Sequence, residues 1–295
     1  MLAIFAPLLS IDIGIDPVLF DFAGIEVTWH GLFTALGVIG GVAVSGYFAR
    51  RAGYPEDMIY NVALSLVIGG IIGARALYVI ENWSQFENNL GDIVAINTGG
   101  ISIYGALIGG TIGGWLYAYF RKVPNIPRGA DIAVLGGIVG MAIGRVGDII
   151  NGEHFASDTD LPWGVIYTDP QSPSFQHFGA AALPQHPAVA YEMIGDLLIF
   201  ALLVLVYVRI PRAGVTFFAW MLLYGLLRTL VSFLRLDDIV LAGLRTAQLI
   251  GIAASAIGLV GIIYLLRTPP QDVRLTRAER RRIVREETPE EHPAS

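Results

Sequence analysis

The sequence contains no cysteine. The chain therefore has no disulfide framework, no thiolate ligands for a metal, and no thioester intermediate of its own. If thiol chemistry takes place on this protein, the thiol must come from a substrate.

Charge is also scarce. Only 15% of the 295 residues are charged, whereas 54% are hydrophobic, and the mean hydropathy is +0.61. These values fit poorly with a soluble domain of this size and favour an integral membrane protein. The net charge of -6 leaves no basic face for backbone phosphates, so we expect no nucleic-acid partner.

Long apolar segments recur along the chain. A spanning helix needs about 20 mostly apolar residues, and seven segments meet this requirement: 31–49, 59–80, 101–120, 130–151, 187–208, 214–235 and 244–266. We expect an all-α integral membrane protein with seven transmembrane helices. A single transmembrane catalytic domain over 1–268 is expected to precede a charged cytoplasmic tail over 269–295.

Basic residues alternate between the connecting segments. They follow the first, third, fifth and seventh spans, whereas 81–99 and 152–186 contain no lysine or arginine. The positive-inside rule therefore places the N-terminus outside and the C-terminus in the cytoplasm. The segment 152–186 is rich in proline, glycine, serine and aromatic residues, and we expect it to form an ordered external cap.

Two predicted spans carry glycines at four-residue spacing: Gly105, Gly109 and Gly113 in one, and Gly136, Gly140 and Gly144 in the next. Small residues on one helix face allow helices to approach closely in lipid. We therefore interpret these glycines as packing positions.

Arginine within a span is unusual, since it costs about 2.5 to 3.5 kcal/mol even on insertion scales and marks a candidate functional site. Five arginines lie inside or at the ends of spans: Arg75, Arg145, Arg228, Arg235 and Arg245. Arg145 and Arg228 lie six and seven residues before the outer ends of their spans, roughly 10 Å below the outer surface. Other polar residues are predicted in the same layer: Trp29, His30, Tyr104, His186, Tyr191 and Glu192.

Helical spacing groups these residues further. Arg145 and Asp148 are three apart, and a second set steps by four, four and three along one helix face: Tyr224, Arg228, Ser232 and Arg235. Guanidinium groups with few neutralising acids suit a phosphodiester, which indicates an anionic phospholipid. The alternative is that Arg145 pairs with Asp148 or Glu153, and Arg228 with Glu192, only to stabilise the bundle.

Residues 144–153 read Gly-Arg-Val-Gly-Asp-Ile-Ile-Asn-Gly-Glu. This run closely resembles the signature of prolipoprotein diacylglyceryl transferases, Gly-Arg-x-Gly-Asn-x-x-Asn-x-Glu. The likeness extends from Trp29 to about Gln248 and includes 99–110, 162–165, His186-Pro187 with Tyr191-Glu192, and 224–228.

The resemblance implies transfer of the diacylglyceryl group of phosphatidylglycerol to the lipobox cysteine of a prolipoprotein signal peptide, forming a thioether and releasing glycerol phosphate. It implies no metal and no cofactor, with membrane lipids around the chain. The expected location is the bacterial plasma membrane, as a multi-pass protein whose active site faces the outer leaflet.

By the same resemblance, Arg145 would bind the phosphate and Arg228 would stabilise charge on the departing glycerol phosphate. The residues expected to be catalytic are Arg145, Arg228, Tyr104 and Glu153. Those expected to bind substrate are Arg145, His30, Asp148, Asn151, Gly152, Tyr224, Glu192 and Arg235.

Several positions depart from the family pattern. Asp148 stands where asparagine is common, Tyr104 where histidine is common, His30 where tyrosine is usual, and Ser232 where glutamate is usual. A thiol with a pKa of about 8.5 needs help to ionise at neutral pH. The candidate bases, among which the sequence leaves the choice open, are His30, Tyr104, Glu153, His154, His186 and Glu192.

Two other functions account for buried arginines. A small-anion transporter would need polar residues that continue to the cytoplasmic face, whereas the inner halves of these spans are mostly apolar. A non-catalytic lipid-binding protein would differ from the transferase only in lacking activity.

Overall fold

The computed structural model describes residues 10–22, 25–87, 89–94, 100 and 102–269. The chain forms two compact units. The first lies within Met1–Ser45 and Pro127–Val273, and the second within Gly46–Ile126 and Arg274–Ser295. Apart from its first residue, the predicted tail over 269–295 lies outside the described residues.

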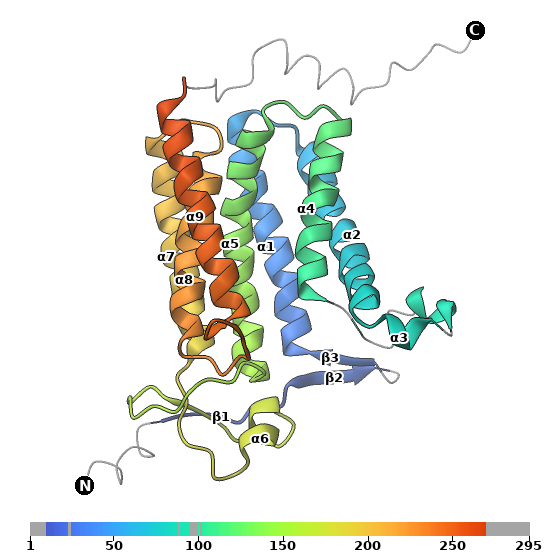
Figure 1. The fold of residues 1–295 in the computed structure, drawn as a ribbon, viewed down its shortest axis with the longest axis vertical. Helices are drawn as coiled ribbons and strands as arrows, with labels where there is room; N and C mark the ends of the chain where they lie inside the picture. The colour runs from blue at the N-terminus through green and yellow to red at the C-terminus, as the bar shows by residue number, and fades with distance from the viewer. Residues whose placement is uncertain (1–9, 23–24, 88, 95–99, 101, 270–295) are drawn as a thin grey trace. The chain divides into compact units, whose positions relative to one another are not determined.

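Long helices make up most of both units (Figure 1). Those of the first unit are α1 (Trp29–Ala52, which continues beyond Ser45 into the second unit), α5 (Ile126–Asn151), α7 (Ala188–Arg209), α8 (Val215–Ser232) and α9 (Thr246–Arg267). The second unit contains α2 (Glu56–Glu81), α3 (Trp83–Phe86), the 3-10 helix η2 (Leu90–Val94) and α4 (Ile103–Phe120).

Six helices among the described residues are long and apolar enough to cross a membrane: α1, α5, α7, α8, α9 and the part of α2 from Asp57 to Glu81. Many of their large apolar side chains are exposed, including Ile39 at 65% and Ile72 at 64%, as expected for helices that face lipid. The prediction of a mostly helical, multi-pass membrane protein is therefore confirmed. The remaining predicted segment, 101–120, coincides with α4.

One predicted helix is too long. The apolar pattern places a helix over 214–235, but α8 ends at Ser232. Arg235 instead forms an isolated β-bridge with Ala156, and the N–H of Leu236 donates to the carbonyl of Phe155. Arg235 therefore does not continue the helical face of Arg228, because pairing with the 152–186 segment replaces the last helical turn.

Glycines determine how closely α1 and α5 approach. A Cβ built on Gly136 would lie 2.1 Å from the oxygen of Gly41, and one on Gly140 would lie 2.7 Å from the oxygen of Gly37. The predicted packing role is confirmed for Gly136 and Gly140. Gly144 differs, because no described atom lies within 4 Å of a Cβ at that position.

The same device joins α2 and α4 in the second unit. A Cβ on Gly105 or on Gly109 would lie 2.2 Å from the backbone oxygen of Gly73 or Gly69, respectively. A Cβ on Gly113 would lie 2.4 Å from the oxygen of Ser65. The backbones of these two helices are therefore in contact, as the glycine spacing predicts.

Replacing Gly109 with alanine is expected to lower the free energy of unfolding by about 1–3 kcal/mol, since the methyl group would overlap backbone atoms that must move apart. Thermal unfolding in detergent would measure the loss. Gly70→Ala is the matched control, because its Cβ would meet the nearest described atom, the oxygen of Ala106, at 3.4 Å. Equal unfolding temperatures for the two variants would contradict the packing role.

Arg75 holds backbone in the second unit. Its guanidinium donates to the carbonyl oxygens of Ile93 (2.8 Å), Gly100 (2.7 Å) and Asp92 (2.6 Å). The side chain is 6% exposed. These contacts give Arg75 a structural role and so explain an arginine within a span, for which the sequence offered no reason.

Short strands and one short helix gather at the end of the first unit where α5 terminates (Figure 1). Strand β1 (Ile11–Ile13) pairs in parallel with β4 (Val165–Tyr167), and β2 (Val18–Phe22) pairs antiparallel with β3 (Ile25–Thr28). The remaining elements of this kind are α6 (Pro173–Phe178), β5 (Ile239–Leu241) and β6 (Leu244–Arg245). The 152–186 segment therefore contains regular structure next to the ends of α5 and α7.

Candidate active site

Two arginines from different helices share one carboxylate. Arg145 on α5 and Arg228 on α8 both contact Glu192 on α7. The Nη2 of Arg145 lies 2.5 Å from Oε2 of Glu192, and the Nη1 of Arg228 donates to Oε1. Glu192 is 1% exposed. Its two oxygens thus bring together guanidiniums that are 83 positions apart in the sequence.

Arg145 also contacts an acid on its own helix. Its Nη1 donates to Oδ2 of Asp148 at 2.9 Å, as the spacing of three residues allows. Two of these ion pairs, Arg145 with Asp148 and Arg228 with Glu192, are those expected if the arginines only stabilise the helix bundle. The contact of Arg145 with Glu192 is an additional pair. A guanidinium has five N–H donors, so these pairings leave donors for a ligand.

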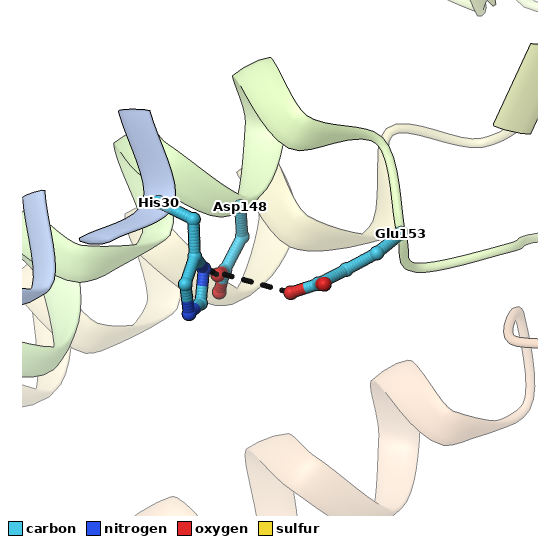
Figure 2. A group of neighbouring side chains, drawn as sticks. All are labelled: His30, Asp148 and Glu153. Carbon is cyan, nitrogen blue, oxygen red and sulfur yellow. Dashed lines mark hydrogen bonds and ion pairs between the residues drawn. The ribbon is translucent and has the colours of Figure 1, made fainter. Parts of the chain in front are cut away.

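Asp148 lies at the centre of a second set of contacts. Its Oδ1 lies 2.8 Å from Nδ1 of His30 on α1, and its Oδ2 lies 3.6 Å from Nε2 of His154. Figure 2 shows His30, Asp148 and Glu153 facing one another, with Glu153 on the segment that follows α5. The Oε1 of Glu153 lies 3.5 Å from Nδ1 of His30.

Gly147 allows α1 to begin beside α5. A Cβ at this position would lie 2.8 Å from the Cα of His30 and 3.0 Å from both the oxygen of Trp29 and the Cβ of Phe33. The missing side chain therefore lets the first turn of α1 contact α5 next to Asp148.

If the chain catalyses the diacylglyceryl transfer that the resemblance implies, the rate of that transfer is expected to fall by at least about tenfold in Gly147→Ala, because a shift of about 1 Å in reacting groups is costly. The added methyl group must displace the backbone of His30. Gly137→Ala on the same helix is the matched control, since no described atom lies within 4 Å of its Cβ. Full activity of the Gly147 variant would show that this contact does not position His30.

The turn after α5 is fixed by a left-handed glycine and a tyrosine. Gly152 has φ +71°, a conformation that glycine adopts without strain. The hydroxyl of Tyr167 donates to the carbonyl of Ile149 at 2.8 Å. Burial, and then the charge of Asp148, raise the pKa of Tyr167 to about 12, so this phenol remains a donor at neutral pH. The turn therefore keeps one geometry.

Asn151 and Glu153 contact each other across this turn, with Asn151 Nδ2 donating to Oε2 of Glu153 at 2.8 Å. The side chain of Glu153 is 37% exposed. The turn thus presents a carboxylate that is oriented by an amide and open on one side.

Arg235 forms a paired ionic contact with Asp237. Its Nε lies 2.9 Å from Oδ2 and its Nη2 lies 3.1 Å from Oδ1. Burial acts to raise the pKa of Asp237, but the hydrogen bonds and charge of Arg235 outweigh it and lower that pKa. Nη2 also contacts Nδ1 of His154 at 3.2 Å. Among the described residues, buried Nη1 has no hydrogen-bond partner.

Tyr224 on α8 lies within the electrostatic range of Arg145, Glu192 and Arg228, and its ring stacks on Trp220 with centroids 5.7 Å apart. Asp196, one turn from Glu192 on α7, is fully buried, and neither of its oxygens has a hydrogen-bond partner among the described residues. Asp196 is absent from the residues predicted from the sequence, although its four-residue spacing from Glu192 was a signal that could have found it.

Tyr104 is the one predicted site residue that belongs to the second unit. Its backbone belongs to α4 in the second unit, and its side chain lies outside the described residues. The other predicted site residues belong to the first unit. His154, a candidate base in the sequence, contacts Arg235 and lies near Asp148. Asp237 and Tyr167 also contribute contacts here, and the sequence offered no spacing pattern that would select either of them.

The fold and this cluster define a multi-pass membrane protein with paired arginines and carboxylates at one end of its helices. The family model described as prolipoprotein diacylglyceryl transferase matches residues 17–264. The chain therefore belongs to the prolipoprotein diacylglyceryl transferase family, and it is a transferase.

Curated relatives cover most of the chain. A protein of Nostoc sp. is 36% identical over 269 residues, covering 87% of this chain and 92% of the relative. A protein of Clostridioides difficile is 34% identical over 250 residues, covering 85% and 95%. A protein of Synechococcus elongatus is 35% identical over 271 residues, covering 88% and 91%. Each is named phosphatidylglycerol–prolipoprotein diacylglyceryl transferase.

Proposed function

We propose that this chain transfers the diacylglyceryl group of phosphatidylglycerol to the lipobox cysteine of prolipoproteins, forming a thioether and releasing glycerol phosphate. This is the first step of lipoprotein maturation. The observation that carries the proposal is the convergence of Arg145 and Arg228 on the two oxygens of Glu192. Two guanidiniums that share one carboxylate are also close enough to share one phosphodiester. Membership of the family and the names of the relatives support the same reaction.

Glu192 occupies the position that a phosphate would share with the two arginines. A bound phosphodiester would take over N–H donors of Arg145, which fixes the phosphate, and of Arg228, which stabilises the charge that develops as glycerol phosphate leaves. The negative charge of Glu192 keeps the pair together before the lipid binds. The site is thereby organised in advance of substrate binding.

The remaining residues take supporting roles in the proposal. Tyr104 and Glu153 are proposed as further catalytic residues. The substrate-binding set consists of His30, Asp148, Asn151, Gly152, Tyr224, Glu192 and Arg235, together with Arg145. Because the chain contains no cysteine, the acceptor thiol comes from the prolipoprotein peptide. The proposed reaction uses no cofactor.

For the topology, we propose seven spans, namely the six candidate helices and α4, which is the third span in chain order. The N-terminus lies outside and the C-terminus lies in the cytoplasm. The single catalytic domain covers 1–268. The 152–186 segment is the external cap, and phosphatidylglycerol reaches the site from the outer leaflet of the bacterial plasma membrane. The absence of lysine and arginine from 152–186 supports this orientation.

The test uses purified protein in phosphatidylglycerol-containing micelles with a lipobox peptide. Transfer of radiolabelled diacylglycerol to the cysteine peptide, and none to a serine version of it, is the expected result. Phosphatidylglycerol binding without transfer would favour a lipid-binding protein. Uptake of a labelled small anion into vesicles that contain the protein, with no transfer, would favour a transporter.

A further inference from the structure

The three histidines near the site differ in what their ring nitrogens contact. Nδ1 of His30 lies 2.8 Å from a carboxylate oxygen of Asp148. An ionised carboxylate only accepts hydrogen bonds, so the proton of a neutral His30 ring is on Nδ1 and the lone pair is on Nε2. No hydrogen bond of this Nε2 is found among the described residues. His30 therefore presents a free acceptor nitrogen.

The other two histidines lack this arrangement. Nδ1 of His154 accepts from Nη2 of Arg235 at 3.2 Å, because a guanidinium only donates. Its Nε2 then carries the proton and lies 3.6 Å from Asp148. Nδ1 of His186 is 3.5 Å from the hydroxyl of Tyr191, and no carboxylate among the described residues pairs with this ring. Of the three, His30 alone combines an orienting carboxylate with an unused lone pair.

Exposure separates His30 from the two buried carboxylates of the site, Asp148 and Glu192. Its side chain is 43% exposed, whereas that of Asp148 is 9% and that of Glu192 is 2%. A substrate can thus reach the ring of His30 while the buried carboxylate behind it fixes the ring. The carboxylates next to this ring are those of Asp148 and Glu153, and the charge of Arg145 also acts on it.

We propose that His30 is the general base for the lipobox thiol and that Asp148 is its positioning residue. The inference rests on the proposed function and deepens it. Nδ1 of His30 stays bonded to Asp148 while Nε2 takes the proton from the S–H group, the arrangement in which a carboxylate-oriented imidazole acts as a base.

The chemical step balances without a further reactant. The thiolate sulfur attacks the diacylglyceryl carbon that is bonded to the phosphate oxygen. A C–S bond forms as this C–O bond breaks, and the electron pair leaves on the oxygen of glycerol phosphate. The proton held on Nε2 of His30 then passes to the departing phosphate or to water, which restores the neutral imidazole.

Asp148 also connects the base to the phosphate site. Its Oδ1 bonds His30 and its Oδ2 accepts from Arg145 at 2.9 Å. One carboxylate therefore fixes both the group that ionises the thiol and the group proposed to hold the phosphate. Because Asp148 holds both His30 and Arg145, it fixes the distance and direction between the sulfur and the phosphate-linked carbon that it attacks.

The decisive variant is His30→Asn, because an asparagine amide can keep the hydrogen bond to Asp148 while removing the Nε2 lone pair. Each variant is assayed with two lipobox peptides, one with cysteine and one with selenocysteine. A selenol is ionised at neutral pH and needs no base. We expect transfer to the cysteine peptide to fall by about 100-fold or more, and transfer to the selenocysteine peptide to stay within about threefold of the native protein.

In His30→Asn the ratio of selenol transfer to thiol transfer should rise. Asp148→Asn should raise this ratio by a smaller factor, because it removes the carboxylate that orients His30 and leaves the ring in place. For His154→Gln and His186→Gln we expect any loss to be equal for both peptides. His30→Gln serves as the second variant if asparagine lowers the unfolding temperature.

Three outcomes would overturn the proposal or its basis. Undiminished thiol transfer by His30→Asn would exclude His30 as the base. Equal loss of thiol and selenol transfer by well-folded His30→Asn and His30→Gln would show a structural role. Failure of the native protein to modify either peptide would instead refute the proposed function itself, so the two failures are distinguishable.

Discussion

Replacing either Arg145 or Arg228 with alanine is expected to reduce diacylglyceryl transfer by at least about 100-fold, the effect of removing a donor that stabilises developing charge. The two losses should differ in kind. Arg145 is held by Asp148 and Glu192 and is proposed to fix the phosphate, so its loss should raise the KM for phosphatidylglycerol. Arg228 contacts Glu192 alone among the described acids, and its loss should lower kcat.

Arg209→Ala is the matched control. This arginine lies at the exposed end of α7, the helix that carries Glu192, and the proposal gives it no part in the site. Its replacement should leave kcat and KM within about twofold of the native values. Near-native transfer by both the Arg145 and the Arg228 variants, with intact folding, would refute the phosphate site and would favour the purely structural pairing of these arginines.

The second large effect is expected at Glu192. Its removal leaves two partly buried guanidiniums without their shared carboxylate, and breaking a buried ion pair from one side costs about 3–5 kcal/mol. Glu192→Ala should therefore unfold at a clearly lower temperature in detergent. Added phosphatidylglycerol should recover part of the loss, since a ligand that binds only the folded state stabilises it.

Glu153→Ala provides the comparison for stability. The side chain of Glu153 is 37% exposed and lies 3.5 Å from His30, so its loss should lower the unfolding temperature much less than loss of Glu192. Equal unfolding temperatures for the two variants would mean that the Arg145–Glu192–Arg228 contacts contribute nothing net. A Glu192 variant that phosphatidylglycerol fails to stabilise would argue against a lipid phosphate in this position.

The helices were predictable because each is a run of apolar residues long enough to cross a bilayer, and that property is local. Helix ends were less predictable. The apolar pattern continues past Ser232, yet α8 stops there because Arg235 and Leu236 bond to residues of the 152–186 segment. Such a stop depends on a partner far away in the sequence.

The site shows the same division. The contact of Arg145 with Asp148 follows from helical spacing, and the motif around them identifies the family. The sharing of Glu192 depends on how three helices pack, and the contact of His30 with Asp148 joins residues 118 positions apart. Spacing within one segment gives no access to these contacts. The contact of His30 with Asp148 is possible because Gly147 lets α1 approach α5 closely.

The open space beside Gly144 makes this position suited to a chemical reporter. It precedes Arg145 in the chain, and a Cβ built there has no described atom within 4 Å outside its own stretch of helix. Because the native sequence contains no cysteine, a cysteine introduced at Gly144 would be the sole thiol on the chain. Its rate of alkylation would then show when lipid occupies the neighbourhood of Arg145, without any measurement of turnover.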